Sequence, residues 1–268
     1  MNIEIKNGRL IDPATGLDRV ADLFIANGRI IAIGAAPEDF YVEQAIDATG
    51  LIVAPGLVDL SARLREPGFE YKATLESEMQ AAVAGGVTSL ACPPDTDPPL
   101  DEPGLVEMLK HQARQLNQAN VYPIGALTQQ LQGKRLTEMA ELHDAGCVAF
   151  SQVDIPFENN LALLRSLQYA ATFGFPVWLR PRDHGLVAGG VAHDGEVATR
   201  MGLSGIPVIA ETVALATMLL LVKATGARVH FCRISSASGL EMVRDAKRQG
   251  LPVSCDLSIN HIHLTDLD

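Results

Sequence analysis

Residues 55–68, which read PGLVDLSARLREPG, carry the pattern that decides the fold. The apolar run Leu51–Leu60, punctuated by Pro55-Gly56, is typical of a buried strand. The stretch then becomes polar and leads into Arg65 and Glu66. In α/β barrels the residues that do chemistry lie where strands give way to such loops. The polar residues of this stretch are therefore candidates for a functional site.

From residue 51 onward the sequence repeats a strand, a loop and a helix. Seven strands alternating with helices predict a parallel sheet, and so many successive units favour a (β/α)8 TIM-like barrel over an open sheet. A closed barrel needs eight strands, so we expect the barrel to be incomplete in this chain, with its last strand or strands missing. The predicted strands are 51–60, 87–91, 121–126, 147–151, 176–179, 228–232 and 252–256, and the predicted helices are 74–84, 104–118, 137–144, 158–173, 211–225 and 239–249.

Residues 1–52 have a different pattern, which predicts a small antiparallel, β-sandwich-like domain before a barrel domain over 53–268. Asn7-Gly8 predicts a turn, and Asn27-Gly28 predicts a hairpin between strands 22–26 and 29–33. Residues 44–48 fit a further edge strand. In the barrel domain, the Gly-rich connection 182–201 is either a mobile lid or an ordinary connection.

Composition limits the classes of partner. The net charge of −11 argues against a surface for nucleic acid or anionic membranes. The longest apolar run, 213–222, is too short to cross a bilayer, and the N-terminus has no signal-peptide pattern. The four cysteines are far apart, and this spacing predicts buried, reduced thiols in a cytoplasmic protein. They are Cys92, Cys147, Cys232 and Cys255.

The stretch at 59–65 resembles the first barrel strand of the dihydroorotases, within the amidohydrolase superfamily. In that family the pattern Asp-x-His-x-His-Leu-Arg supplies two zinc-binding histidines. Here Ser61 and Arg63 stand at the two ligand positions. The resemblance implies a barrel of the metal-dependent hydrolase type.

The second motif, GGVTSLACPPDTDP at 85–98, resembles the family stretch that ends Pro-Asn-Thr-Asn-Pro. The resemblance makes Arg65 and Asp95 a vestigial substrate-binding pair, since the family uses Arg and Asn here to hold a substrate carboxylate. An acid at position 95 would repel such a carboxylate. A salt bridge from Arg65 to Asp95 or Glu66 is the alternative interpretation.

The resemblance extends over nearly the whole chain and places Gln152, Arg180 and Arg233 at the remaining ligand positions that can be matched. Arginine offers no lone pair to a metal, and a neutral amide is a poor zinc ligand. We therefore expect no zinc cofactor and no catalytic residue. His230 matches a family histidine that does not bind zinc, and a core or supporting role is expected. The pair His261-x-His263 has no evident acid partner.

Three arginines would thus stand where metal ions are bound in the family, with Arg65 and Arg182 beside them. Buried like charges need counter-charges. We expect an Arg–Asp network that holds the strands together, and the alternative is a site for a phosphate or carboxylate ligand. The predicted counter-charges are Asp59, Asp95, Asp97 and Asp183.

Two functions from different classes follow from the resemblance. The first is a non-catalytic dihydroorotase homologue that acts as a structural partner of the aspartate carbamoyltransferase catalytic subunit in pyrimidine biosynthesis. The second is an active hydrolase of cyclic amides that uses another metal site or none. An incomplete barrel would expose unpaired strand edges. We therefore expect a longer natural protein or an edge covered by another chain, and a homo-oligomer.

Overall fold

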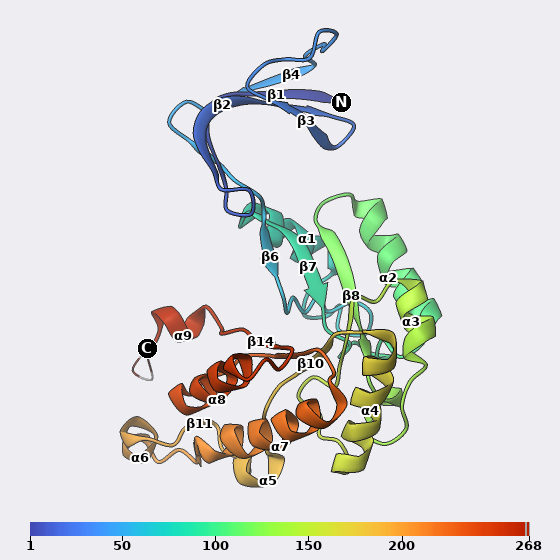
Figure 1. The fold of residues 1–268 in the computed structure, drawn as a ribbon, viewed down its shortest axis with the longest axis vertical. Coiled ribbons are helices and arrows are strands. Elements are labelled where there is room, and N and C mark those ends of the chain that lie inside the picture. Colours follow the sequence, from blue (N-terminus) through green and yellow to red (C-terminus); the bar gives the residue numbers. More distant parts are fainter. Residues whose placement is uncertain (266, 268) are drawn as a thin grey trace. The chain divides into compact units, whose positions relative to one another are not determined.

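The computed structural model describes residues 1–265 and residue 267 (Figure 1). The chain divides into two compact units, Met1–Leu57 and Val58–Asp268. The boundary lies five residues beyond the predicted 52/53, because Ile52–Val53 pairs with the first strand of the N-terminal unit. Each unit is described by itself.

The N-terminal unit is one five-stranded sheet in the order β3-β2-β1-β4, with β5 also paired to β1. The hairpins β1–β2 and β2–β3 are antiparallel, and Asn27-Gly28 forms the tight turn of the second, as predicted. Both β4 and β5 run parallel to β1, which makes the sheet mixed. Its strands are β1 (Asn2–Asp12), β2 (Leu17–Ala26), β3 (Arg29–Ile33), β4 (Gln44–Asp47) and β5 (Ile52–Val53).

The predicted turn at Asn7-Gly8 is wrong, because β1 continues through both residues. The strand register shifts between Ile5 and Gly8, and Asn7 adopts a φ of 59°. The positive φ therefore makes a bulge instead of a reversal. A Cβ added at Gly8 would lie 2.7 Å from a methyl carbon of Val53, so glycine is required where β5 packs against β1.

The second unit contains a seven-stranded sheet that confirms six of the predicted strands (Figure 1). The predicted buried strand 51–60 is wrong in part, because Ile52–Val53 pairs with β1 of the N-terminal sheet and only Leu57–Asp59 joins this one. Leu57 and Val58 are also exposed, at 62% and 61%. Neighbouring strands from β7 to β14 are parallel. They form the incomplete α/β barrel expected from the sequence. In order across the sheet the strands are β14 (Val253–Cys255), β13 (Val229–Phe231), β10 (Val177–Leu179), β9 (Ala149–Ser151), β8 (Asn120–Ala126), β7 (Val87–Cys92) and β6 (Leu57–Asp59).

The six predicted helices are also present, and they connect successive strands. They are α1 (Leu75–Ala84), α2 (Pro103–Leu116), α3 (Met139–Ala145), α4 (Asn160–Phe173), α7 (Ile209–Thr225) and α8 (Ala237–Arg248). The connection after β10 contains two short helices and a two-stranded parallel pair, and a short helix follows β14. These elements are α5 (His184–Val187), β11 (Ala192–His193), α6 (Glu196–Met201), β12 (Gly205–Ile206) and α9 (Asn260–His263).

The core between the sheet and its helices is mostly aliphatic. Phe150, Leu127 and Leu167 are fully buried. All four cysteines are free, but only Cys92 and Cys147 are buried, and the other two are half-buried. No helix in the part of the chain that the structure describes is long and apolar enough to cross a membrane. The polar strand ends of this unit are the region to search for a site.

Candidate functional site

Four of the five positions that the resemblance matches to metal ligands of the family meet at the carboxyl ends of the barrel strands. Ser61 and Arg63 follow β6, Arg180 follows β10, and Arg233 follows β13. Their side chains line a cavity of only about 20 Å³. That volume holds about one water molecule. The strand ends therefore form a closely packed cluster of cationic side chains.

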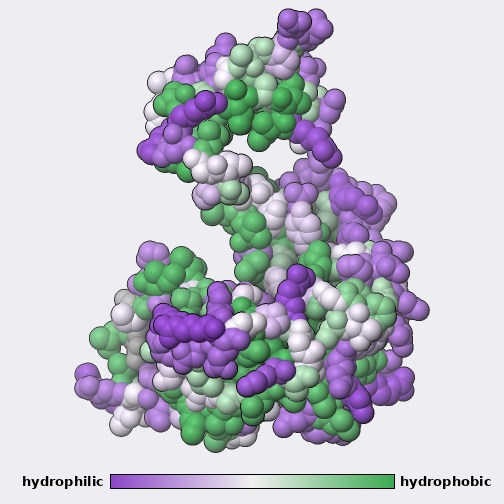
Figure 2. Space-filling model, in the orientation of Figure 1, coloured by the Kyte–Doolittle hydropathy of each residue, from purple (hydrophilic) through white to green (hydrophobic). Residues whose placement is uncertain are grey.

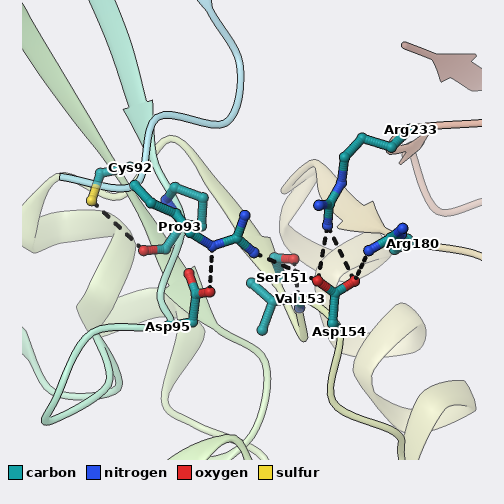
Figure 3. A network of polar contacts seen from close by, with 9 residues as sticks. Cys92, Pro93, Asp95, Ser151, Val153, Asp154, Arg180 and Arg233 are labelled. Carbon is teal, nitrogen blue, oxygen red and sulfur yellow. Dashed lines mark hydrogen bonds and ion pairs between the residues drawn. The ribbon is translucent and has the colours of Figure 1, made fainter. Parts of the chain in front are cut away.

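The carboxylate of Asp154 lies at the centre of this cluster (Figure 3). Arg180 Nη1 donates to one of its oxygens at 2.8 Å, and Arg233 Nη2 lies 3.1 Å from both. Arg63 Nη2 forms an ion pair with the same carboxylate at 3.6 Å and donates from Nε to Asp95 at 2.6 Å. Two carboxylates thus hold three guanidinium groups. The predicted Arg–Asp network is confirmed for Asp95, and Asp154 is its centre.

The other three predicted counter-charges are wrong. Asp59 accepts a hydrogen bond from the backbone of Ser61 at 2.8 Å, and Asp183 caps α5 by accepting from Leu186 at 2.9 Å. Asp97 forms no side-chain hydrogen bond or ion pair with any described residue. Asp59 and Asp183 therefore bind the backbone of their own loops instead of a guanidinium group.

Asp154 was missed because the matched motif ends at Val153. That residue adopts a φ of 50°, a rare conformation for a β-branched side chain, and its N–H donates to Ser151 Oγ at 3.0 Å. The chain turns there, directly after β9, and Asp154 comes to lie beside the arginines. A search for any acid within three residues of a predicted strand end would have found it.

Arg65 does not make the predicted salt bridge. Asp95 binds Arg63 instead, and Glu66 accepts from the backbone N–H of Leu75 at 2.9 Å, at the start of α1. Arg65 forms no ion pair with a described residue. Arg65 and Asp95, the proposed vestigial substrate-binding pair, therefore do not contact each other through a hydrogen bond or ion pair between described residues.

Gln152, the fifth of these matched positions, is 2% exposed and has a structural role. Its amide oxygen accepts from Thr128 Oγ1 at 2.8 Å, and its amide nitrogen donates to the carbonyl of Leu131 at 2.7 Å. Both ends of the amide are thus used to hold the loop after β8.

His230 belongs to a second polar group, at the ends of β13 and β14. Its Nε2 lies 3.1 Å from Asp256, and its Nδ1 lies 2.8 Å from Ser254 Oγ. Potential ligand atoms of His230, Cys232 and Asp256 lie within 4.8 Å of one another, a grouping that the sequence analysis missed. However, both ring nitrogens are engaged, and Asp256 also accepts from the backbone of Arg233. Burial raises the pKa of the Cys232 thiol to about 12.

The acidity of Asp154 reflects a balance of two effects. Burial by itself raises the pKa of this carboxyl, but hydrogen bonds and attraction from Arg180 and Arg233 outweigh it. The pKa is therefore held below its ordinary value. Ionised Asp154 is the form that the fold stabilises.

Replacing Asp154 by Asn should destabilise the protein by about 2 kcal/mol, because three guanidinium groups lose their shared charge while the shape is kept. The value is set below that for a fully buried pair, since Asp154 is 33% exposed. Asp245→Asn is the matched control, because it removes a carboxylate from an exposed helical pair and should cost less than about 0.5 kcal/mol. Urea unfolding at pH 7 measures both. An equal loss of unfolding free energy in the two variants would contradict the conclusion that Asp154 holds the arginine cluster together.

The same variant should change the pH dependence of stability. A lowered pKa in the folded state means that Asp154 stabilises the fold above the unfolded pKa of about 3.9, and this contribution is lost as the pH falls through the folded pKa. The difference in unfolding free energy between wild type and Asp154→Asn should therefore be constant near neutral pH and shrink below about pH 4.5. A difference that grows on acidification would be the opposite result.

Comparisons with known proteins agree with the fold and the strand-end motifs. A family model described as "Dihydro-orotase-like" matches residues 50–239. Among solved structures, the L-hydantoinase of Arthrobacter aurescens superimposes with a TM-score of 0.81 at 24% identity, covering 96% of this chain and 58% of that one. At this identity the likeness shows a shared fold.

Curated relatives are closer in sequence. A "Dihydroorotase-like protein" of Pseudomonas aeruginosa is 51% identical, and a "Dihydroorotase" of Syntrophus aciditrophicus is 40% identical. Both alignments cover 99% of this chain and 63% of the relative, so this chain spans less than two thirds of their length. Together with the family match over residues 50–239, these relatives establish that the chain belongs to the dihydroorotase-like family.

Proposed function

We propose that this chain is a non-catalytic dihydroorotase homologue with a scaffolding role for aspartate carbamoyltransferase in pyrimidine biosynthesis. The observation that supports a non-catalytic function is the binding of Arg63, Arg180 and Arg233 by Asp154. These arginines stand at ligand positions of the family motif. The network joins the ends of three separate strands, and this is a structural role.

The zinc that the family implies does not fit the residues at these positions. The side chains are Ser61, Arg63, Gln152, Arg180 and Arg233. Arginine has no lone pair for a metal, and Gln152 already uses both ends of its amide. A dication would also be repelled by three nearby guanidinium groups. We derive no metal-dependent step for this site.

The alternative function is hydrolysis of cyclic amides by another metal site. The group of His230, Cys232 and Asp256 is the observation that favours it, since these donors suit zinc. Binding a metal there would break a hydrogen bond of His230 and require ionisation of a thiol whose pKa is about 12. The adjacent Arg233 adds repulsion. We therefore favour the non-catalytic function.

Exposed apolar side chains support a role in association. Hydrophobic residues gather on the visible face of the N-terminal sheet (Figure 2). Val20 and Ile30 on this sheet are 67% and 61% exposed, and Leu220 on α7 is 69% exposed. Contiguous apolar surface commonly marks a protein interface. We propose two partners, the aspartate carbamoyltransferase catalytic subunit and a second copy of this chain. We also propose that the protein is cytoplasmic, where its four thiols stay reduced.

A metal and activity measurement tests the catalytic part. Protein purified from zinc-supplemented medium should contain zinc far below one ion per chain and should not interconvert dihydroorotate and carbamoyl-aspartate above background. The Syntrophus aciditrophicus relative, treated identically, is the positive control for the assay. One zinc per chain together with turnover comparable to that control would support the alternative function.

The scaffold role requires a direct test with aspartate carbamoyltransferase from the same organism. Because the proposed role is structural, the two proteins should elute together from a sizing column at micromolar concentration. Light scattering on each protein alone provides the control for self-association. Independent elution of the two proteins would rule out the scaffold role while leaving the catalytic question open.

A further inference from the structure

A second and larger cavity lies next to the Asp154 network and is separate from the water-sized space inside it. Its volume is about 580 Å³, which is large enough for a small metabolite. Arg180 and Arg233 line both spaces, so the cavity adjoins the network at these two residues. Arg182, His193 and His261 line the larger cavity as well.

The charge of this cavity is positive, although the whole chain carries −11. Glu211 is the one acid among its described lining residues. Its oxygens each accept two hydrogen bonds at 2.6–3.0 Å, from the backbone N–H and hydroxyl groups of Ser235 and Ser236. Glu211 therefore serves to hold the loop before α8. It does not pair with an arginine of the cavity.

Several donors in this cavity remain available. Arg182 forms no hydrogen bond or ion pair with a described residue. Among the described residues, the Arg180 side chain donates only from Nη1 and the Arg233 side chain only from Nη2, in both cases to Asp154. Ser238 lies in the first turn of α8, where the helix offers no acceptor for its backbone N–H. The guanidinium groups of Arg180 and Arg233 are thus held in place, and all three arginines keep donors that are not used by a described residue.

We propose that this cavity binds a small phosphate-bearing molecule. Arginine donors match the oxygens of phosphate in pairs, and the backbone N–H of Ser238 in the first turn of α8 adds a donor for the same anion. The network supports the site because Asp154 fixes Arg180 and Arg233 from behind. The proposal goes beyond the non-catalytic function and does not depend on it, since ligand binding requires no turnover.

Isothermal titration with inorganic pyrophosphate at low ionic strength tests this site, with citrate as the carboxylate probe. The variant Arg182→Gln removes one cavity guanidinium, and it should fold normally because Arg182 has no partner to lose. The control Arg200→Gln removes the same charge from an exposed position on α6 that does not line the cavity. Thermal melts confirm that both variants are folded.

The wild type should bind one pyrophosphate per chain, and more tightly than citrate. Arg182→Gln should weaken pyrophosphate binding about tenfold, the loss expected for one charge-assisted contact, and Arg200→Gln should change it less than about twofold. Absence of saturable binding by the wild type would overturn the proposal. Equal weakening by the two variants would contradict a specific site, because it would show that binding depends only on the overall charge of the chain. Tighter binding of citrate than of pyrophosphate would show that the cavity does not select phosphate.

Discussion

The barrel mouth depends on one carboxylate that holds three guanidinium groups. Asp154 binds Arg63, Arg180 and Arg233, which follow β6, β10 and β13. Without it, three cations would lie close together at the strand ends, where partial burial strengthens their repulsion. The low pKa of Asp154 shows that the folded state stabilises its charge. The acid and the arginines are therefore mutually required.

This arrangement explains how a dihydroorotase-like frame persists with other side chains at its ligand positions. Metal ions in such a site would link ligands from several strands by charge, and the Arg–Asp contacts link strands in the same way. Arg63 also reaches Asp95 after β7, which ties the first strands together. Gln152 uses its amide to hold the loop after β8. The side chains at these positions thus stabilise the strand ends and the loops that follow them.

The sequence predicted the strands and helices well, because apolar runs and the glycines after helices are local signals. It failed at Asn7-Gly8, where a sequence typical of turns forms a bulge inside β1. Site residues were predictable where a family motif covers them, as for Arg63 and Arg180. The choice of Asp154 over Asp59 depends on the positive φ of Val153 and on competing backbone donors. Neither is visible in a linear sequence.

The central proposal is that guanidinium groups bound by Asp154 stand where the family binds metal ions. The most direct measurement is a crystal structure of the protein grown with zinc, with anomalous scattering recorded at the zinc edge. We expect no anomalous peak among Ser61, Arg63, Gln152, Arg180 and Arg233, and density that joins Asp154 to the arginines. An anomalous peak at these strand ends, with Asp154 turned away from the arginines, would contradict the proposal.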